Sequence, residues 1–169
     1  MIRSRFSELL RHLKGKAELY HIPPENFQDD TADMTVESGG HDITVQGLHF
    51  ADFRYRGVIL VERVPAQTAT MLILHARAWL DTHDDQRGIH ELAEPAITLL
   101  RLDTGNLTDL MLDIEFCDPV YLSKAAADAP ESGVISWDGT DYTLDEYDLW
   151  TAETGEVNRA PLFPPGGDS

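Results

Sequence analysis

The sequence predicts an α+β fold, with a mixed, mainly antiparallel β-sheet, helices packed on one face and a peripheral C-terminal β-hairpin. Two segments carry apolar residues at helical spacing, whereas several others alternate apolar and polar residues or are rich in β-branched ones. Turn residues separate some of the strand-like segments by only a few positions, which favours antiparallel hairpins. The 169 residues are enough for one domain, which we place at 1–150, and a domain of that size buries roughly 70% of its unfolded surface.

A short amphipathic helix is expected at residues 4–14, because Phe6, Leu9, Leu10 and Leu13 recur at helical spacing. Gly15 follows and is expected to end that helix. Residues 22–40 contain two adjacent prolines, three aspartates and two glycines. These signals predict an extended arm or loop with only a weak strand at 35–37.

Two strands are expected next, one from Ile43 and one over 53–64, with a break near residues 51–52. The second is apolar on both faces at residues 58–61, which predicts a position inside the sheet. Gly57 is a candidate for a β-bulge. Pro65 is expected to end this strand.

Residues 66–83 form the strongest helical pattern in the chain. One apolar face holds Leu72, Ala76, Trp79 and Leu80. We expect this helix to cover one face of the sheet, with Trp79 and Leu80 buried.

A β-hairpin is predicted from a strand at 96–103, a turn at 104–106 and a strand at 107–116. The apolar side chains of the second strand alternate with acidic ones, so one face of the hairpin is expected to be acidic. The carboxylates assigned to that face are Asp103, Asp109, Asp113 and Glu115. They form either an ordinary solvent-facing side of the sheet or a surface that repels DNA or binds a basic partner.

A second, smaller hairpin is predicted at 133–144, because Asp138-Gly139 lies between β-prone residues and favours a type I′ turn. Residues 151–169 are expected to be a flexible tail. Their last nine positions hold three prolines and two glycines and little to bury, so deleting 161–169 is expected to leave folding unchanged.

Charge is the most informative feature of the composition. Thirteen Lys and Arg oppose thirty Asp and Glu, for a formal net charge of −17. This balance disfavours binding to nucleic-acid phosphates, and no sequence-specific nucleic-acid binding is expected. The start of the chain lacks the apolar core of a signal peptide, and the most apolar stretch, 71–80, is too short to span a bilayer. A soluble protein without membrane contact is therefore expected.

Motifs for catalysis, cofactors or metals are absent from the sequence, so no catalytic, cofactor-binding or metal-ligating residue is assigned and the protein is expected not to be an enzyme. Cys117 is the only cysteine and is expected to be a buried or strand-end thiol. His75 and His83, eight residues apart on one predicted helix, leave a weaker alternative in which they and nearby carboxylates form the metal site of a small enzyme.

The order of these segments resembles the tail completion protein R family of temperate contractile-tailed phages. The residues that carry the likeness lie in four segments: 55–62, the helix through Leu72-Ile73-Leu74 to Ala78-Trp79-Leu80, 103–112 and 135–144. This family implies a structural virion subunit that caps the tail tube and sheath and prepares the tail for head joining. It also implies a ring of identical subunits, commonly a hexamer, in contact with tube and sheath proteins and the head-tail connector. The implied location is the virion tail, with assembly in the host cytoplasm.

Ring closure requires a patch on one subunit to meet a different patch on the next. The second hairpin and the residues after it are unusually aromatic for a peripheral element and are the expected oligomer interface. Its members are Trp137, Tyr142, Tyr147 and Trp150. A soluble acidic adaptor or assembly chaperone for basic partners remains as the alternative function.

Overall fold

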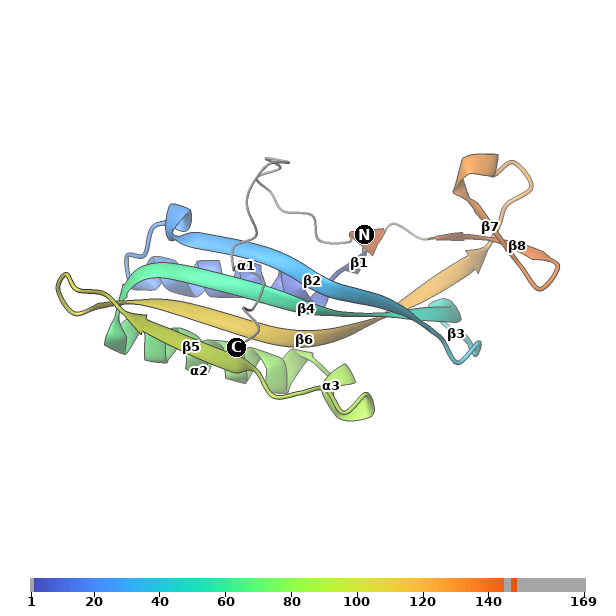
Figure 1. Cartoon of the computed structure of the whole chain (residues 1–169). Helices are drawn as coiled ribbons and strands as arrows, with labels where there is room; N and C mark the ends of the chain where they lie inside the picture. The colour runs from blue at the N-terminus through green and yellow to red at the C-terminus, as the bar shows by residue number, and fades with distance from the viewer. Residues whose placement is uncertain (1, 145–146, 149–169) are drawn as a thin grey trace, which may run out of the picture.

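The computed structural model describes residues 2–144 and 147–148. It has two layers, a long twisted sheet and two helices that run along one face of it (Figure 1). In chain order the elements are β1 (Ile2–Arg3), α1 (Arg5–Leu19), η1 (Pro24–Asn26), β2 (Phe27–Ser38), β3 (Ile43–Thr44), β4 (Gly47–Pro65), α2 (Ala66–His83), α3 (Gln86–Ile89), β5 (Ala96–Arg101), β6 (Leu107–Lys124), η2 (Glu131–Gly133), β7 (Val134–Trp137), β8 (Thr140–Leu144) and β9 (Tyr147–Asp148). The α+β class is confirmed.

The main sheet has the order β2-β4-β6-β8-β7, with β5 beside the first part of β6 and β3 beside the start of β4. All of these pairs are antiparallel, and the parallel pair β1–β9 forms a separate two-stranded sheet. Strand β6 is shared, because residues 108–113 pair with β5 and residues 122–124 pair with β8. It therefore links the core of the molecule to the peripheral hairpin.

The first helix begins where the sequence predicts but ends later. Ser4 is its N-cap, and the Ser4 Oγ accepts a hydrogen bond from the Ser7 backbone N–H at 3.2 Å. The prediction that Gly15 ends the helix is wrong, since α1 continues to Leu19 and buries Ala17. A Cβ at Gly15 would have no heavy atom within 4 Å, so this glycine lies on the open side of the helix.

Helix α2 has the predicted bounds and packs on the sheet together with α1. Trp79 is 6% exposed and Leu80 is 1% exposed, which confirms that this face is core. The core between the layers joins the apolar faces of α1 and α2 to the inward side chains of β4 and β6, and its members include Phe6, Leu9, Leu13, Leu72, Leu80, Tyr55, Ile59, Leu110, Leu112, Ile114 and Phe116.

Gly57 lies where the ring of Phe6 contacts the sheet. A Cβ there would lie 2.3 Å from the Phe6 Cδ2, so only glycine leaves room for the ring. The prediction of a bulge at Gly57 is wrong. The register shifts of β4 against β6 fall between His49 and Ala51 and between Val61 and Val64.

The sequence predicts an extended arm or loop at 22–40 with only a weak strand at 35–37, whereas residues 27–38 of this segment form the edge strand β2, paired with β4. Proteins protect an exposed sheet edge with charged residues and bulges, and β2 has both. Because of these charged residues, β2 lacks the apolar alternation by which a buried strand is recognised in a sequence. Asp33, at a φ of 55°, lies in the register shift between Ala32 and Thr35 and forms an ion pair with Arg56. The aspartates that suggest a loop in the sequence therefore belong to an edge strand.

The two strands predicted at 43–64 are also corrected. They are the two-residue β3 and the single long β4, which passes through residues 51–52 at one of its register shifts. Strand β6 likewise runs beyond residue 116 to Lys124. Polar residues at 52 and 118 interrupt the apolar pattern, but both are buried with partners.

A buried ionic cluster fixes the helices to the sheet. The Arg5 guanidinium at the start of α1 lies 3.2 Å from Asp118 in β6 and 3.4 Å from Asp84 after α2. The Tyr55 hydroxyl donates a 2.7 Å hydrogen bond to the other oxygen of Asp118. Burial raises the pKa of Asp84, although Arg5 and Arg87 oppose that shift.

The second predicted hairpin is confirmed as β7 and β8. Asp138 has a φ of 48° and Gly139 a φ of 75°, which fits the predicted type I′ turn with both central residues in the left-handed region. The hairpin projects beyond the helical layer at one end of the sheet (Figure 1).

Candidate assembly surfaces

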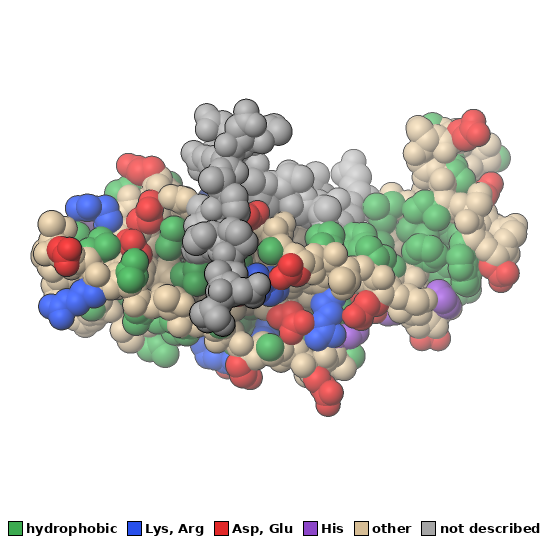
Figure 2. Space-filling view, viewed as in Figure 1, with side chains coloured by type: hydrophobic (Ala, Val, Ile, Leu, Met, Phe, Trp, Pro, Cys, Tyr) green, Lys and Arg blue, Asp and Glu red, His purple; other side chains and the backbone are tan. Residues whose placement is uncertain are grey.

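The projecting hairpin carries aromatic side chains against the end of the long sheet. The Trp137 ring lies 4.7 Å from His41 in the β2–β3 turn, 6.1 Å from Phe50 in β4 and 6.3 Å from Tyr142 in β8 (centroid distances). These four residues are called the aromatic cluster below. It connects the hairpin to the sheet, and hydrophobic side chains gather beside the hairpin (Figure 2).

Part of this cluster faces solvent. Trp137, Tyr142 and Phe50 are half-buried and His41 is exposed, while Ile135 on the same hairpin is 37% exposed. Aromatic rings that are only partly covered by their own chain are available to a partner surface. Of the other expected interface residues, Tyr147 is in β9 without a described side chain, and Trp150 lies outside the described residues.

The predicted acidic face lies on the side of the sheet away from the helices, and it is mixed in charge. Strand β6 places Asp109, Asp113 and Glu115 on this face, and Asp103 lies in the β5–β6 turn. Arg56 of β4 pairs with Asp113 at 3.6 Å. Lys and Arg side chains accordingly lie among the Asp and Glu side chains on that face (Figure 2).

Glu115 has the best-defined environment of these carboxylates. It accepts hydrogen bonds from the Arg54 Nε at 2.7 Å and from the Ala93 backbone N–H at 2.9 Å. The Arg54 bond and then the Ala93 bond lower the pKa of Glu115. The Arg87 guanidinium also donates to the Glu115 backbone carbonyl at 2.9 Å. Glu115 therefore holds the segment between α2 and β5 against the edge of β6.

His75 and His83 are engaged in separate contacts. The His75 Nε2 is 3.1 Å from the Tyr20 hydroxyl, and the His83 ring stacks on Trp79 with a centroid distance of 5.0 Å. His83 also lines an open groove of about 530 Å³ between α1 and α2, together with Glu8 and His12. Neither His75 nor His83 belongs to a metal-ligand group among the side chains that the structure describes.

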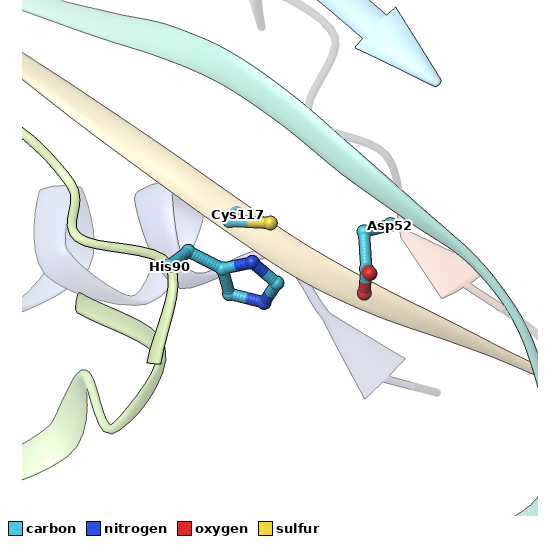
Figure 3. A group of neighbouring side chains, drawn as sticks. All are labelled: Asp52, His90 and Cys117. Atoms are coloured by element: carbon cyan, nitrogen blue, oxygen red, sulfur yellow. The ribbon is translucent and has the colours of Figure 1, made fainter. Parts of the chain in front are cut away.

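A different set of residues brings three possible metal-ligand atoms close together. Asp52 in β4, His90 after α3 and Cys117 in β6 each place one ligand atom so that all three lie within 4.8 Å of one another (Figure 3). The sequence predicts a buried or strand-end thiol at Cys117 but does not join these three residues, because only the register of β4 against β6 and the path of the segment after α2 bring them together.

Within the described part of the chain, no helix is both long enough and apolar enough to span a membrane.

Comparison with known proteins identifies the relatives of this chain. A family model described as P2 phage tail completion protein R (GpR) matches residues 7–145. The chain is 28% identical over 146 residues to an uncharacterized 19.2 kDa protein in the rep-hol intergenic region of Haemophilus phage HP1 (strain HP1c1), which covers 85% of this chain and 84% of that protein. No solved structure matches.

Proposed function

Because the chain belongs to the P2 phage tail completion protein R family, we propose that it is a structural subunit that caps the tail tube and sheath and prepares the tail for head joining. The match over residues 7–145 carries this proposal. It includes nearly all of α1, both long strands, α2 and the projecting hairpin, so the likeness extends over the main sheet and its helices.

A cap works by presenting one surface to the end of the polymer and blocking further addition. We place self-association in the aromatic cluster and the hairpin that carries it. A ring needs a patch that meets a different patch on the next subunit. A projecting hairpin reaches a neighbour without enlarging the core, and half-buried Trp and Tyr rings supply contact area.

The negative net charge is compatible with a subunit that lines the channel through which DNA passes. A formal charge of −17 makes the surface repel phosphates, so DNA would pass without adhering. In this proposal the protein forms a ring, most simply a hexamer as in the terminators that it resembles, and contacts tube, sheath and connector. It assembles in the host cytoplasm and has no catalytic role.

The proposal is tested with a contractile-tailed phage whose own tail completion gene is deleted and supplied by this chain from a plasmid. We expect tails of uniform length that join heads and form plaques. Without the chain, we expect tubes and sheaths of irregular length and free heads in electron micrographs. Uniform, head-joined tails in the absence of any completion protein would contradict the proposal.

The adaptor alternative is favoured by the charge of −17 but weakened by the acidic face, where Arg54 and Arg56 already pair with Glu115 and Asp113. Light scattering of the purified protein distinguishes an adaptor from a ring subunit. An adaptor stays a monomer or dimer and binds basic tail proteins in a salt-sensitive manner, whereas a ring subunit forms a higher oligomer alone or on purified tails.

A further inference from the structure

Asp52, His90 and Cys117 come from three separate elements and converge on one side of the sheet. Cys117 is fully buried and Asp52 is 5% exposed, while His90 is half-buried. A carboxylate, an imidazole and a thiol are all groups that bind metals, and here they meet where solvent has little access. Their ligand atoms lie within 4.8 Å of one another (Figure 3).

The ligand types match a divalent transition metal of intermediate softness. Zinc is bound by Cys sulfur at about 2.3 Å and by His nitrogen or Asp oxygen at about 2.0–2.2 Å, so neighbouring ligand atoms in a tetrahedral site are about 3.5 Å apart. Closing the triangle from at most 4.8 Å to that spacing requires side-chain movement of about one ångström. His90 can supply it, since it lies outside the helices and strands and is only half-buried.

The total charge of the three side chains also matches that of a divalent cation. A carboxylate, a thiolate and a neutral imidazole carry two negative charges in total, which a divalent cation neutralises inside a buried site. Asp52 also has a hydrogen-bond partner outside the group of three. The His49 Nε2 lies 2.8 Å from the Asp52 Oδ1, a contact that orients the carboxylate as the outer partners of metal ligands do.

From this geometry we propose that Asp52, His90 and Cys117 bind one zinc ion per chain, with a fourth position open to water. Binding replaces the Cys117 thiol proton, which leaves to solvent as the sulfur–zinc bond forms, and no electron is transferred. The ion joins the segment between α2 and β5 to both central strands. It would therefore reinforce the attachment that Arg87 and Glu115 already provide.

In the metal-free protein the thiol is held protonated. Burial, followed by the nearby Asp52, raises the pKa of Cys117 to about 12. A bound cation lowers the pKa of the thiol instead, and a thiol that coordinates a metal is deprotonated. Binding of zinc by the thiolate therefore releases one proton for each ion bound.

The test uses the purified full-length chain, stripped with a chelator under reducing conditions and titrated with Co²⁺, a spectroscopic substitute for zinc. We expect one equivalent to bind with a sulfur-to-cobalt charge-transfer band, and Zn²⁺ to displace it and raise the melting temperature. The chain has a single cysteine, so within one subunit such a band reports Cys117 alone. If stripped wild-type protein gives neither the band nor a zinc-dependent change in melting temperature, the three residues are a hydrogen-bonded cluster and the proposal is overturned.

Variants identify the other ligands. Cys117→Ser removes the band, and Asp52→Asn and His90→Ala each weaken Co²⁺ binding at least tenfold. The matched control is His75→Ala with His83→Ala, which removes two histidines elsewhere in the fold and leaves the titration unchanged. Loss of binding in that control, or full binding by His90→Ala, would overturn the assignment.

Discussion

Replacing Gly57 by alanine tests the packing of α1 on the sheet. The added Cβ would lie 2.3, 2.6 and 2.8 Å from three carbons of the Phe6 ring. Carbon atoms in contact prefer about 3.5–4.0 Å, so the ring has to retreat by more than one ångström. Phe6 is fully buried, with the Phe116 ring at a centroid distance of 5.8 Å, so it has little room.

Overpacking of this kind costs about 1–3 kcal/mol, and for a chain of this size that lowers the melting temperature by about 2–12 °C. Chemical denaturation and thermal scans followed by circular dichroism measure it. Gly15→Ala is the matched control, because its Cβ would meet nothing within 4 Å and helix propensity predicts a gain of about 1 kcal/mol.

A double-mutant cycle tests whether the cost of Gly57→Ala comes from the clash with the Phe6 ring. In a Phe6→Leu background the smaller side chain can move aside, so Gly57→Ala is expected to cost at least about 0.5 kcal/mol less than in the parent. If Gly57→Ala is as stable as the parent, or if its cost is unaffected by Phe6→Leu, the packing of α1 described above is wrong.

Trp79→Ala is expected to cost about 3–5 kcal/mol, whereas Leu74→Ala, at a position 55% exposed on the same helix, stays within about 0.5 kcal/mol; equal melting temperatures would contradict the core assignment. Tyr55→Phe removes the donor to the buried Asp118 carboxylate and is expected to cost about 1–3 kcal/mol in urea unfolding, and an unchanged midpoint would refute that. In metal-free protein, Cys117 is expected to resist thiol reagents until unfolding. Its pKa is raised from 9.0 to about 12, so above pH 9 the unfolded chain binds fewer protons than the folded one. Stability therefore falls with rising pH by up to about 1.4 kcal/mol per unit, a dependence that Cys117→Ser should lack.

Elements with strong local patterns are predictable from the sequence. Helix α2 has its predicted bounds, and the Asp138-Gly139 turn adopts the positive φ angles that its residues favour. Helix α1 is longer than predicted, because a glycine on an exposed helix face weakens the helix without ending it when Ala17 beyond it packs in the core.

Features that depend on distant pairing are not predictable in this way. The aspartates of β2 suggest a loop, and only the partnership with β4 explains them as parts of an edge strand. The arginines that pair with Asp113 and Glu115 come from β4, about sixty residues earlier. Asp52, His90 and Cys117 likewise have no common spacing in the sequence; the register of β4 against β6 brings Asp52 near Cys117, and the path of the segment after α2 brings His90 to them.

The most direct test of the proposed function is whether the aromatic cluster is needed for assembly but not for folding. Trp137→Ser with Tyr142→Ser is expressed in place of the deleted completion gene, and tails are counted by electron microscopy. We expect a folded protein with the parental circular dichroism spectrum that fails to form rings or head-joined tails, whereas His75→Ala with His83→Ala assembles normally. Parental numbers of head-joined tails with the aromatic variant would contradict the account, and loss of assembly by the histidine variant alone would favour a metal-dependent enzyme.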